Sequence, residues 1–144
     1  MVSLPSGSEL GRYQILERIG IGGMASVYRA LDPTLNRDIA IKVLPSYQAE
    51  DPTFVERFSR EAQAVARLNN PNITQIHDFG EDKGFSFIVM ELVTGGTLQD
   101  RLDGPMSLAD ILAVIRPLAA ALDYAHAQGI VHRDLKPTNI LLAP

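Results

Sequence analysis

The sequence predicts an α+β fold in which five strands and one inserted helix are followed by a mainly helical segment. Five apolar stretches have strand-like patterns, and a single helical pattern interrupts them after the third. Glycine-containing turns favour two antiparallel strand pairs. Few strand–helix–strand units are present, so the pattern argues against a doubly wound parallel sheet.

The first three strands are predicted over residues 13–19, 25–31 and 38–44. Alternating apolar residues indicate the first two, and a nearly continuous apolar run indicates the third. Gly20-Ile21-Gly22-Gly23 and Asp32-Pro33 mark the turns between them. Residues 1–12 contain Ser, Gly and Pro, and we expect them to form a loose leader.

A helix is predicted to begin at Asp51-Pro52, because an N-cap residue followed by proline is a common helix start. Its apolar stripe ends at Asn69-Asn70-Pro71. Two further strands are predicted around a hairpin turn at residues 80–84, over residues 73–79 and 85–93. A capping box at Ser107 then opens a long helix that ends at Gly129.

Composition excludes several classes of protein. The 144 residues are 46% hydrophobic and 21% charged, which is ordinary for a globular domain, and the net charge of −4 gives no basic surface for nucleic acid. There is no cysteine, so a disulfide framework and a thiol nucleophile are excluded. With no signal peptide and no 18-residue apolar run, we expect a cytoplasmic segment, although a longer parent chain could carry a membrane anchor elsewhere.

Two features of the strand region suit a phosphate-binding site. The glycines of Gly20-x-Gly22-Gly23 open a strand instead of a helix, and glycine lets backbone N–H groups approach phosphates closely. Lys42 lies in the middle of an apolar strand, where its ammonium group must reach water or an anion. Each feature has an ordinary alternative, namely a hairpin turn and a solvent-facing lysine. Glu61 in the following helix could likewise be a surface residue beside Arg60.

A dense polar segment runs from His132 to Asn139 between two apolar stretches. Asp134 could accept a proton from an attacking hydroxyl group, and Lys136 could neutralise a phosphoryl group in transfer. Asn139 could give its carbonyl oxygen to Mg²⁺, a hard cation that prefers oxygen ligands. The segment therefore has the residue types needed for phosphoryl transfer.

The segment His132-Arg133-Asp134-Leu135-Lys136-Pro137-Thr138-Asn139 resembles the catalytic loop of protein kinases. The glycine loop, the Ala40-Ile41-Lys42 strand, the helix glutamate and Met90-Glu91-Leu92-Val93 occur in the order found in that family. Residues 20–28 are most similar to bacterial serine/threonine kinases of eukaryotic type. The resemblance implies a kinase N-lobe and hinge over residues 13–93 and a partial helical C-lobe over residues 94–144.

ATP and Mg²⁺ are the cofactors that this resemblance implies. The residues over the phosphates would be Gly20, Gly22 and Gly23. Lys42 would hold the α- and β-phosphates, oriented by an ion pair with Glu61.

The resemblance also implies an adenine site. Its walls would be Ile19, Val27, Ala40 and Leu141. Met90 would be the gatekeeper, and the backbone groups of Glu91 and Val93 would form hydrogen bonds with the adenine.

The implied acceptors are serine and threonine hydroxyl groups of protein substrates. Asp134 would be the base or hydroxyl-orienting residue, Lys136 the γ-phosphate partner and Asn139 a metal ligand. His132 is expected to be a packed structural residue. Thr97 and Thr138 stand where some kinases carry glutamates that read substrate arginine, so a basic consensus is not expected.

The residues end at Pro144 without the Asp-Phe-Gly metal motif of a complete kinase domain. We therefore expect this chain on its own to be inactive. We also expect self-association through an uncovered apolar stripe on its last helix: Leu112, Ile115, Leu118, Ala119 and Leu122. The alternative function is a non-catalytic, kinase-like nucleotide-binding or interaction module, against which the intact Lys42, Asp134 and Asn139 argue.

Overall fold

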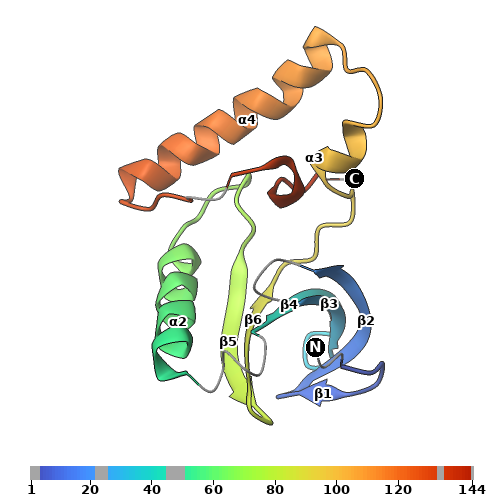
Figure 1. Cartoon of the computed structure of the whole chain (residues 1–144), viewed down its shortest axis with the longest axis vertical. Helices are drawn as coiled ribbons and strands as arrows, with labels where there is room; N and C mark the ends of the chain where they lie inside the picture. Colours follow the sequence, from blue (N-terminus) through green and yellow to red (C-terminus); the bar gives the residue numbers. More distant parts are fainter. Residues whose placement is uncertain (1–3, 22–25, 45–50, 133–134, 144) are drawn as a thin grey trace. The chain divides into compact units, whose positions relative to one another are not determined.

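The computed structural model describes residues 4–21, 26–44, 51–132 and 135–143 (Figure 1). The chain forms two compact units. The first comprises Met1–Arg67 and Thr74–Leu92, and the second comprises Leu68–Ile73 and Val93–Pro144.

The first unit is built on a six-stranded sheet in which every neighbouring pair is antiparallel. The spatial order is β1-β2-β3-β4-β6-β5. The strands are β1 (Glu9–Leu10), β2 (Tyr13–Ile21), β3 (Ser26–Asp32), β4 (Arg37–Val43), β5 (Ile76–Asp82) and β6 (Phe85–Met90). The five predicted strands are all present, and the α+β class is confirmed.

The short strand β1 lies where the sequence predicts a loose leader. That prediction is wrong for the described part of the leader, because Leu10 is fully buried and β1 pairs with β2. The leader also reaches the β5–β6 hairpin: Gly11 N donates to Asp82 Oδ2 at 2.8 Å, and Lys83 Nζ donates to Glu9 O at 2.8 Å. The sheet is therefore curled, so that its first strand meets its last pair.

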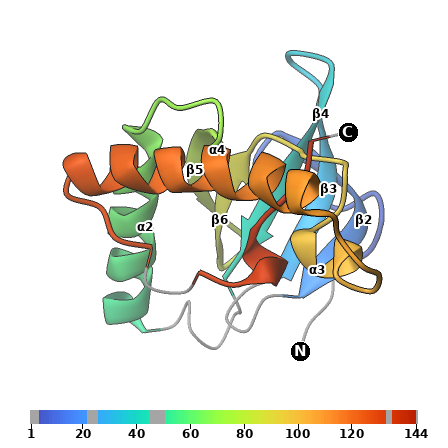
Figure 2. The ribbon, with the colours of Figure 1, turned by 90° about the horizontal axis from the view of Figure 1, so that it is seen from above.

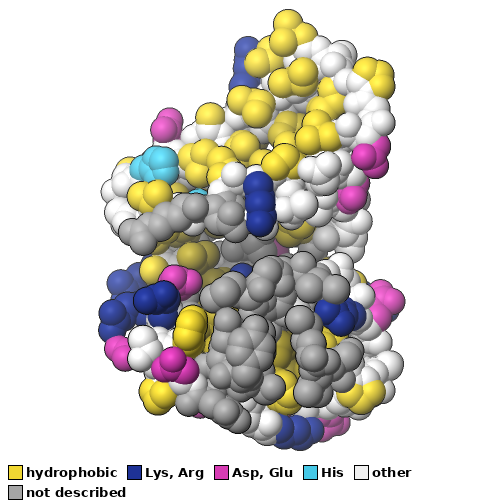
Figure 3. Space-filling model, in the orientation of Figure 1, with side chains coloured by type: hydrophobic (Ala, Val, Ile, Leu, Met, Phe, Trp, Pro, Cys, Tyr) yellow, Lys and Arg dark blue, Asp and Glu magenta, His cyan; other side chains and the backbone are white. Residues whose placement is uncertain are grey.

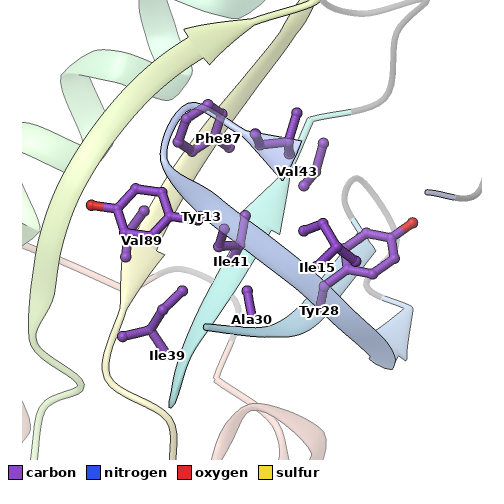
Figure 4. Packing of buried hydrophobic residues seen from close by; sticks show 10 residues of the cluster. Tyr13, Ile15, Tyr28, Ala30, Ile39, Ile41, Val43, Phe87 and Val89 are labelled. Atoms are coloured by element: carbon purple, nitrogen blue, oxygen red, sulfur yellow. The ribbon is translucent and has the colours of Figure 1, made fainter. Parts of the chain in front are cut away.

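The core of this unit lies on one face of the curled sheet, where alternate residues of the strands converge (Figure 4). Tyr28 opposes Ile41 and Ala30 opposes Ile39 in the β3–β4 register, so their side chains share that face. The buried cluster comprises Leu10, Tyr13, Ile15, Tyr28, Ala30, Ile39, Ile41, Val43, Phe87 and Val89. Among the described residues, the opposite face of the sheet contributes none to this cluster.

The hairpin between β5 and β6 is tighter than the sequence indicates. Its loop is only Lys83 and Gly84, which have φ of 53° and 80°. Positive φ at both central residues is the geometry of a type I′ turn, whose twist matches that of the flanking strands. Strand β5 consequently extends to Asp82. It begins at Ile76, later than predicted, and β6 ends at Met90 instead of residue 93.

One helix, α2 (Pro52–Ala66), packs on the sheet of the first unit. Its predicted start is confirmed: the Asp51 side chain accepts a hydrogen bond from Thr53 N at 2.9 Å. The Phe58 ring contacts the Phe79 ring of β5 with centroids 5.9 Å apart. Ala62 is the buried residue of the helix.

The second unit contains α3 (Leu98–Arg101), the long α4 (Leu108–Ala127) and the 3₁₀ turn η1 (Pro137–Asn139), as Figure 2 shows. The predicted start of α4 is confirmed, because Ser107 Oγ accepts from Asp110 N at 3.1 Å. The chain leaves α4 through Gly129, whose φ is 81°. Tyr124 Oη accepts from Asn69 N at 2.9 Å and ties residues 68–73 to α4.

Apolar side chains remain uncovered on the second unit, and many are visible in Figure 3. Leu108, Ile111, Leu112 and Ile115 of α4 are 71%, 41%, 37% and 46% exposed. Only Ala121 and Ala125 of α4 are buried. Across the described residues, no helix has both the length and the apolar character needed to cross a membrane.

Candidate active site

Strand register gathers five of the predicted nucleotide-binding residues on one face of the sheet. Gly20 opposes Val27, Val27 opposes Lys42, and Ala40 opposes Met90. Directly opposed residues share a face, and residues two apart along a strand share it too. All five therefore lie on the face that the core cluster leaves free.

These residues are buried or half-buried, which is the range of exposure expected for the wall of a ligand site. Ala40 is 5% exposed, whereas Val27, Lys42 and Met90 are half-buried. Ile19 is 47% exposed and stands at a register shift between Arg18 and Gly20, so it has no directly opposed partner. The predicted phosphate-covering residues Gly22 and Gly23 lie outside the described residues.

Lys42 and Glu61 are not joined in this structure. Glu61 is exposed on α2, and no ion pair within the described part of the chain links it to Lys42. Arg60, the neighbour that offered Glu61 a surface role, pairs with Glu56 instead, with Nη2 2.6 Å from Oε1. The ion pair expected for an active arrangement is therefore not formed in this conformation.

The backbone of Glu91 is held by Gln75. Glu91 N donates to Gln75 O at 3.0 Å, and Gln75 N donates to Glu91 Oε1 at 2.8 Å. These bonds continue the β5–β6 ladder beyond Ile76 and Met90. They engage the Glu91 N–H in a hydrogen bond within the chain.

His77 lies near the hydrogen-bonded pair Glu91 and Gln75, and it is neutral at pH 7. Burial lowers the pKa of His77 below its usual value of 6.5, and the charge of Arg37 lowers it further. Glu91 and Asp32 act in the opposite direction but do not outweigh burial. The surroundings of Glu91 therefore gain no positive charge from His77 near neutral pH.

In the second unit, the predicted catalytic loop follows the end of α4. Ile130 N donates to Ala125 O at 2.9 Å, which turns the chain back after Gly129. His132 is exposed, so the expectation that it is a packed structural residue is wrong for this structure. Asp134, the predicted base, lies outside the described residues.

The end of the loop is ordered by η1. Asn139 N donates to Lys136 O at 2.9 Å, and both side chains are exposed. Leu141 is 44% exposed and Val93 is half-buried, both within this second unit.

The described residues contain no group of three His, Asp or Glu side chains that could hold a metal ion. The amide oxygen of Asn139 fits one position of a hard-cation site.

Two residues of structural importance near the site are not predicted by sequence reasoning. Gln75 has no distinctive signal, because its role is through the backbone. Gly95 is followed by a second glycine, Gly96, and the sequence pattern assigns neither of them a role, yet a Cβ at Gly95 would lie 2.8 Å from the Leu142 carbonyl carbon. The pair of glycines is the signal that could have pointed to this position.

Comparison with known proteins gives a consistent result. Residues 13–144 match the family model of the protein kinase domain. The chain is 44% identical to a probable serine/threonine-protein kinase, PknB, of Bifidobacterium longum, over 98% of the chain and 22% of that protein. It is 47% identical to the serine/threonine-protein kinase PknL of Mycobacterium tuberculosis, over 92% of the chain and 34% of that protein.

Solved structures agree with this result. The PknI kinase domain of M. tuberculosis, in a point-mutant form, has a TM-score of 0.84 at 36% identity, over 99% of this chain and 59% of that one. The apo form of PpkA-294 has a TM-score of 0.86 at 29% identity, over 98% of this chain and 58% of that one. Members of the matched family use ATP and a divalent metal ion. The chain thus spans part of its relatives' length, and it belongs to the protein kinase family.

Proposed function

We propose that the protein is a serine/threonine protein kinase, which transfers the γ-phosphoryl group of ATP to hydroxyl groups of protein substrates. The observation that carries this proposal is the register that places Gly20, Val27, Ala40, Lys42 and Met90 on one sheet face. The relatives named as serine/threonine kinases support the choice of acceptor. The proposed boundary between N-lobe with hinge and C-lobe is at residues 93–94.

The proposed roles follow from chemistry at each position. Val27 and Ala40 provide apolar contact for the adenine, with Ile19 and Leu141, and Met90 is the gatekeeper. The Glu91 carbonyl and the Val93 backbone bind the polar edge of the base. Lys42 neutralises the α- and β-phosphates, which offsets the cost of keeping its ammonium group on a half-buried sheet face. The glycines Gly20, Gly22 and Gly23 let the backbone cover the phosphates.

The transfer step is assigned to the loop of the second unit. Asp134 orients the acceptor hydroxyl group and takes its proton, and Lys136 neutralises charge on the γ-phosphoryl group. Asn139 supplies an amide oxygen to Mg²⁺, which when bound neutralises charge on the phosphates. Positioning and electrostatics account for most of the rate enhancement in such reactions.

A non-catalytic nucleotide-binding role is the second candidate, and one observation favours it. Lys42 and Glu61 do not form an ion pair in this conformation. A kinase would need α2 to move so that Glu61 reaches Lys42 when nucleotide binds. A binding module would need no such movement.

Substitution of Lys42 tests the proposed site, and phosphotransfer by the wild type separates the two candidates. In the full-length protein, Lys42→Met should abolish most transfer from labelled ATP to protein, because the phosphates lose their cationic partner. Lys83→Met is the matched control, since Lys83 lies in the β5–β6 turn and donates to Glu9 O. Full activity of Lys42→Met would refute the proposal. Absence of transfer in wild type, with retained ATP binding, would favour the non-catalytic module.

A further inference from the structure

A short antiparallel ladder holds the chain immediately after Asn139. Leu98 N donates to Ile140 O at 2.9 Å, and Leu142 N donates to Gly96 O at 2.9 Å. Between these two bonds, Thr97 and Leu141 form an isolated antiparallel bridge. The exit of the catalytic loop is therefore fixed to residues 96–98.

Gly95, at the edge of this ladder, has no room for a side chain. A Cβ at this position would overlap the Leu142 carbonyl oxygen, and it would lie 2.8 Å from the Leu142 carbonyl carbon and 2.9 Å from that of Ala143. These are backbone atoms, so no rotamer change could relieve the overlap. Carbon atoms pack at about 3.5–4.0 Å, and the oxygen would lie closer to the new Cβ than either carbon, so the Leu142 carbonyl group would have to move by about 1 Å or more.

The Gly95 side of the ladder is itself anchored, so it cannot easily move away instead. Thr97 N donates to Asp100 Oδ2 at 2.8 Å, and Asp100 N donates to Thr97 Oγ1 at 3.3 Å. This reciprocal capping box ties the segment to the start of α3. Gly96, with φ of 80°, adopts a backbone conformation that suits glycine.

A displacement of Leu142 would be passed to Asn139 through only two intervening residues, Ile140 and Leu141. Ile140 follows Asn139 directly, and its N–H donates to Pro137 O of η1 at 3.4 Å. We propose that Gly95 is a positioning residue for Asn139: its missing side chain lets the residue 96–98 segment hold the metal-binding end of the catalytic loop in place. This inference rests on the proposed kinase function, in which Asn139 is a metal ligand.

The test is the Mg²⁺ dependence of two quantities in the full-length protein carrying Gly95→Ala, namely equilibrium binding of ATP and phosphotransfer. Groups that orient a metal ligand typically change metal affinity or activity by about 10–100-fold when altered. We expect Gly95→Ala to raise the half-saturating Mg²⁺ concentration about tenfold and to lower kcat. The matched control is Gly104→Ala, because nothing lies within 4 Å of a Cβ at Gly104. It should match wild type in both values.

A second variant covers the case in which Gly95→Ala does not fold. Asp100→Ala opens the capping box without adding an atom, and it should raise the Mg²⁺ requirement in the same direction by a smaller factor. If Gly95→Ala, or Asp100→Ala in its place, has the Mg²⁺ dependence of Gly104→Ala, the inference is overturned.

Asn139→Ala distinguishes failure of the inference from failure of the proposed function. If Asn139→Ala raises the Mg²⁺ requirement while Gly95→Ala does not, only the positioning role is wrong. If Asn139→Ala leaves Mg²⁺ dependence unchanged, the assignment of Asn139 as a metal ligand is wrong, and the positioning role fails with it.

Discussion

The two units of the chain differ in how completely they bury their own apolar residues. Among its described residues, the first unit closes a core of ten side chains on one face of its sheet, in which Ile15 and Ile41 are fully buried. The second unit leaves Leu108, Ile111 and Ile115 of its longest helix more than 40% exposed. The first unit therefore carries its own stabilising core, whereas the second leaves much of the apolar surface of α4 exposed.

The comparison extends to the proposed chemistry. The residues assigned to nucleotide binding lie mainly on the sheet of the first unit, and those assigned to transfer lie in the second. Asp134→Asn in the full-length protein should therefore lower kcat by about 1,000-fold, while the Kd for ATP changes by less than about threefold. Rapid-mixing assays with labelled ATP and equilibrium nucleotide binding would measure the two effects. Equal losses in both would mean that the two roles are not separated between the units.

Matched truncations test the difference in burial. Ile41→Ala removes a fully buried side chain and should lower the free energy of unfolding by about 3 kcal/mol, through lost burial and the cavity that remains. Ile115→Ala removes a side chain that is 46% exposed and should cost less than about 1 kcal/mol. Urea denaturation followed by circular dichroism gives both values. Similar costs at the two positions would contradict the comparison.

A hydroxyl group in the first core gives a smaller, pH-dependent effect. Tyr13 Oη donates to Asp78 Oδ2 at 3.0 Å, so Tyr13→Phe should cost about 1 kcal/mol near neutral pH. Burial, together with Asp78, raises the pKa of Tyr13 from 10.0 to about 12. Folding thus favours the neutral phenol, and its contribution is complete below pH 10 and lost as the pH rises toward 12.

Alkaline titration of stability checks this sign. Wild type should lose stability between pH 10 and pH 12, and Tyr13→Phe should lose less over the same interval. Parallel curves for the two proteins would mean that Tyr13 does not titrate with folding.

The exposed face of α4 predicts a modest effect on association. Contiguous exposed apolar surface favours self-association, so Ile115→Glu should reduce any concentration-dependent association of the 144-residue chain. Leu35→Glu is the control, because Leu35 is 58% exposed in the first unit. Sedimentation velocity over a range of concentrations would measure both. An unchanged distribution for Ile115→Glu would show that this face is not the contact.

Element types follow from local sequence signals, and tertiary contacts decide where the elements begin and end. Asp51-Pro52 and Ser107 predict helix starts correctly, because capping is local. Strand β1 cannot be found in this way: its two residues become a strand only by pairing with β2 and burying Leu10 in the core.

The candidate site shows the same division. Resemblance to kinases selects Lys42 and Asn139 by type and order, and the sharing of one sheet face by Ala40 and Lys42 follows from alternation along their strand. The resemblance also implies a Lys42–Glu61 pair, but whether that pair forms depends on the placement of α2, which no local pattern encodes. The constraint at Gly95 arises because Leu142, far away in sequence, approaches its backbone.

The most direct test of the site is chemical labelling with an acyl phosphate derivative of ATP. Its acyl group transfers to a lysine amine held beside the phosphates, forming an amide and releasing the nucleotide. The chain has three lysines, Lys42, Lys83 and Lys136, and mass spectrometry of the full-length protein identifies those modified. We predict labelling of Lys42 that excess ATP suppresses, with Lys83 unaffected by ATP. ATP-insensitive labelling of Lys42, no greater than that of Lys83, would contradict the assignment of this sheet face as the ATP site.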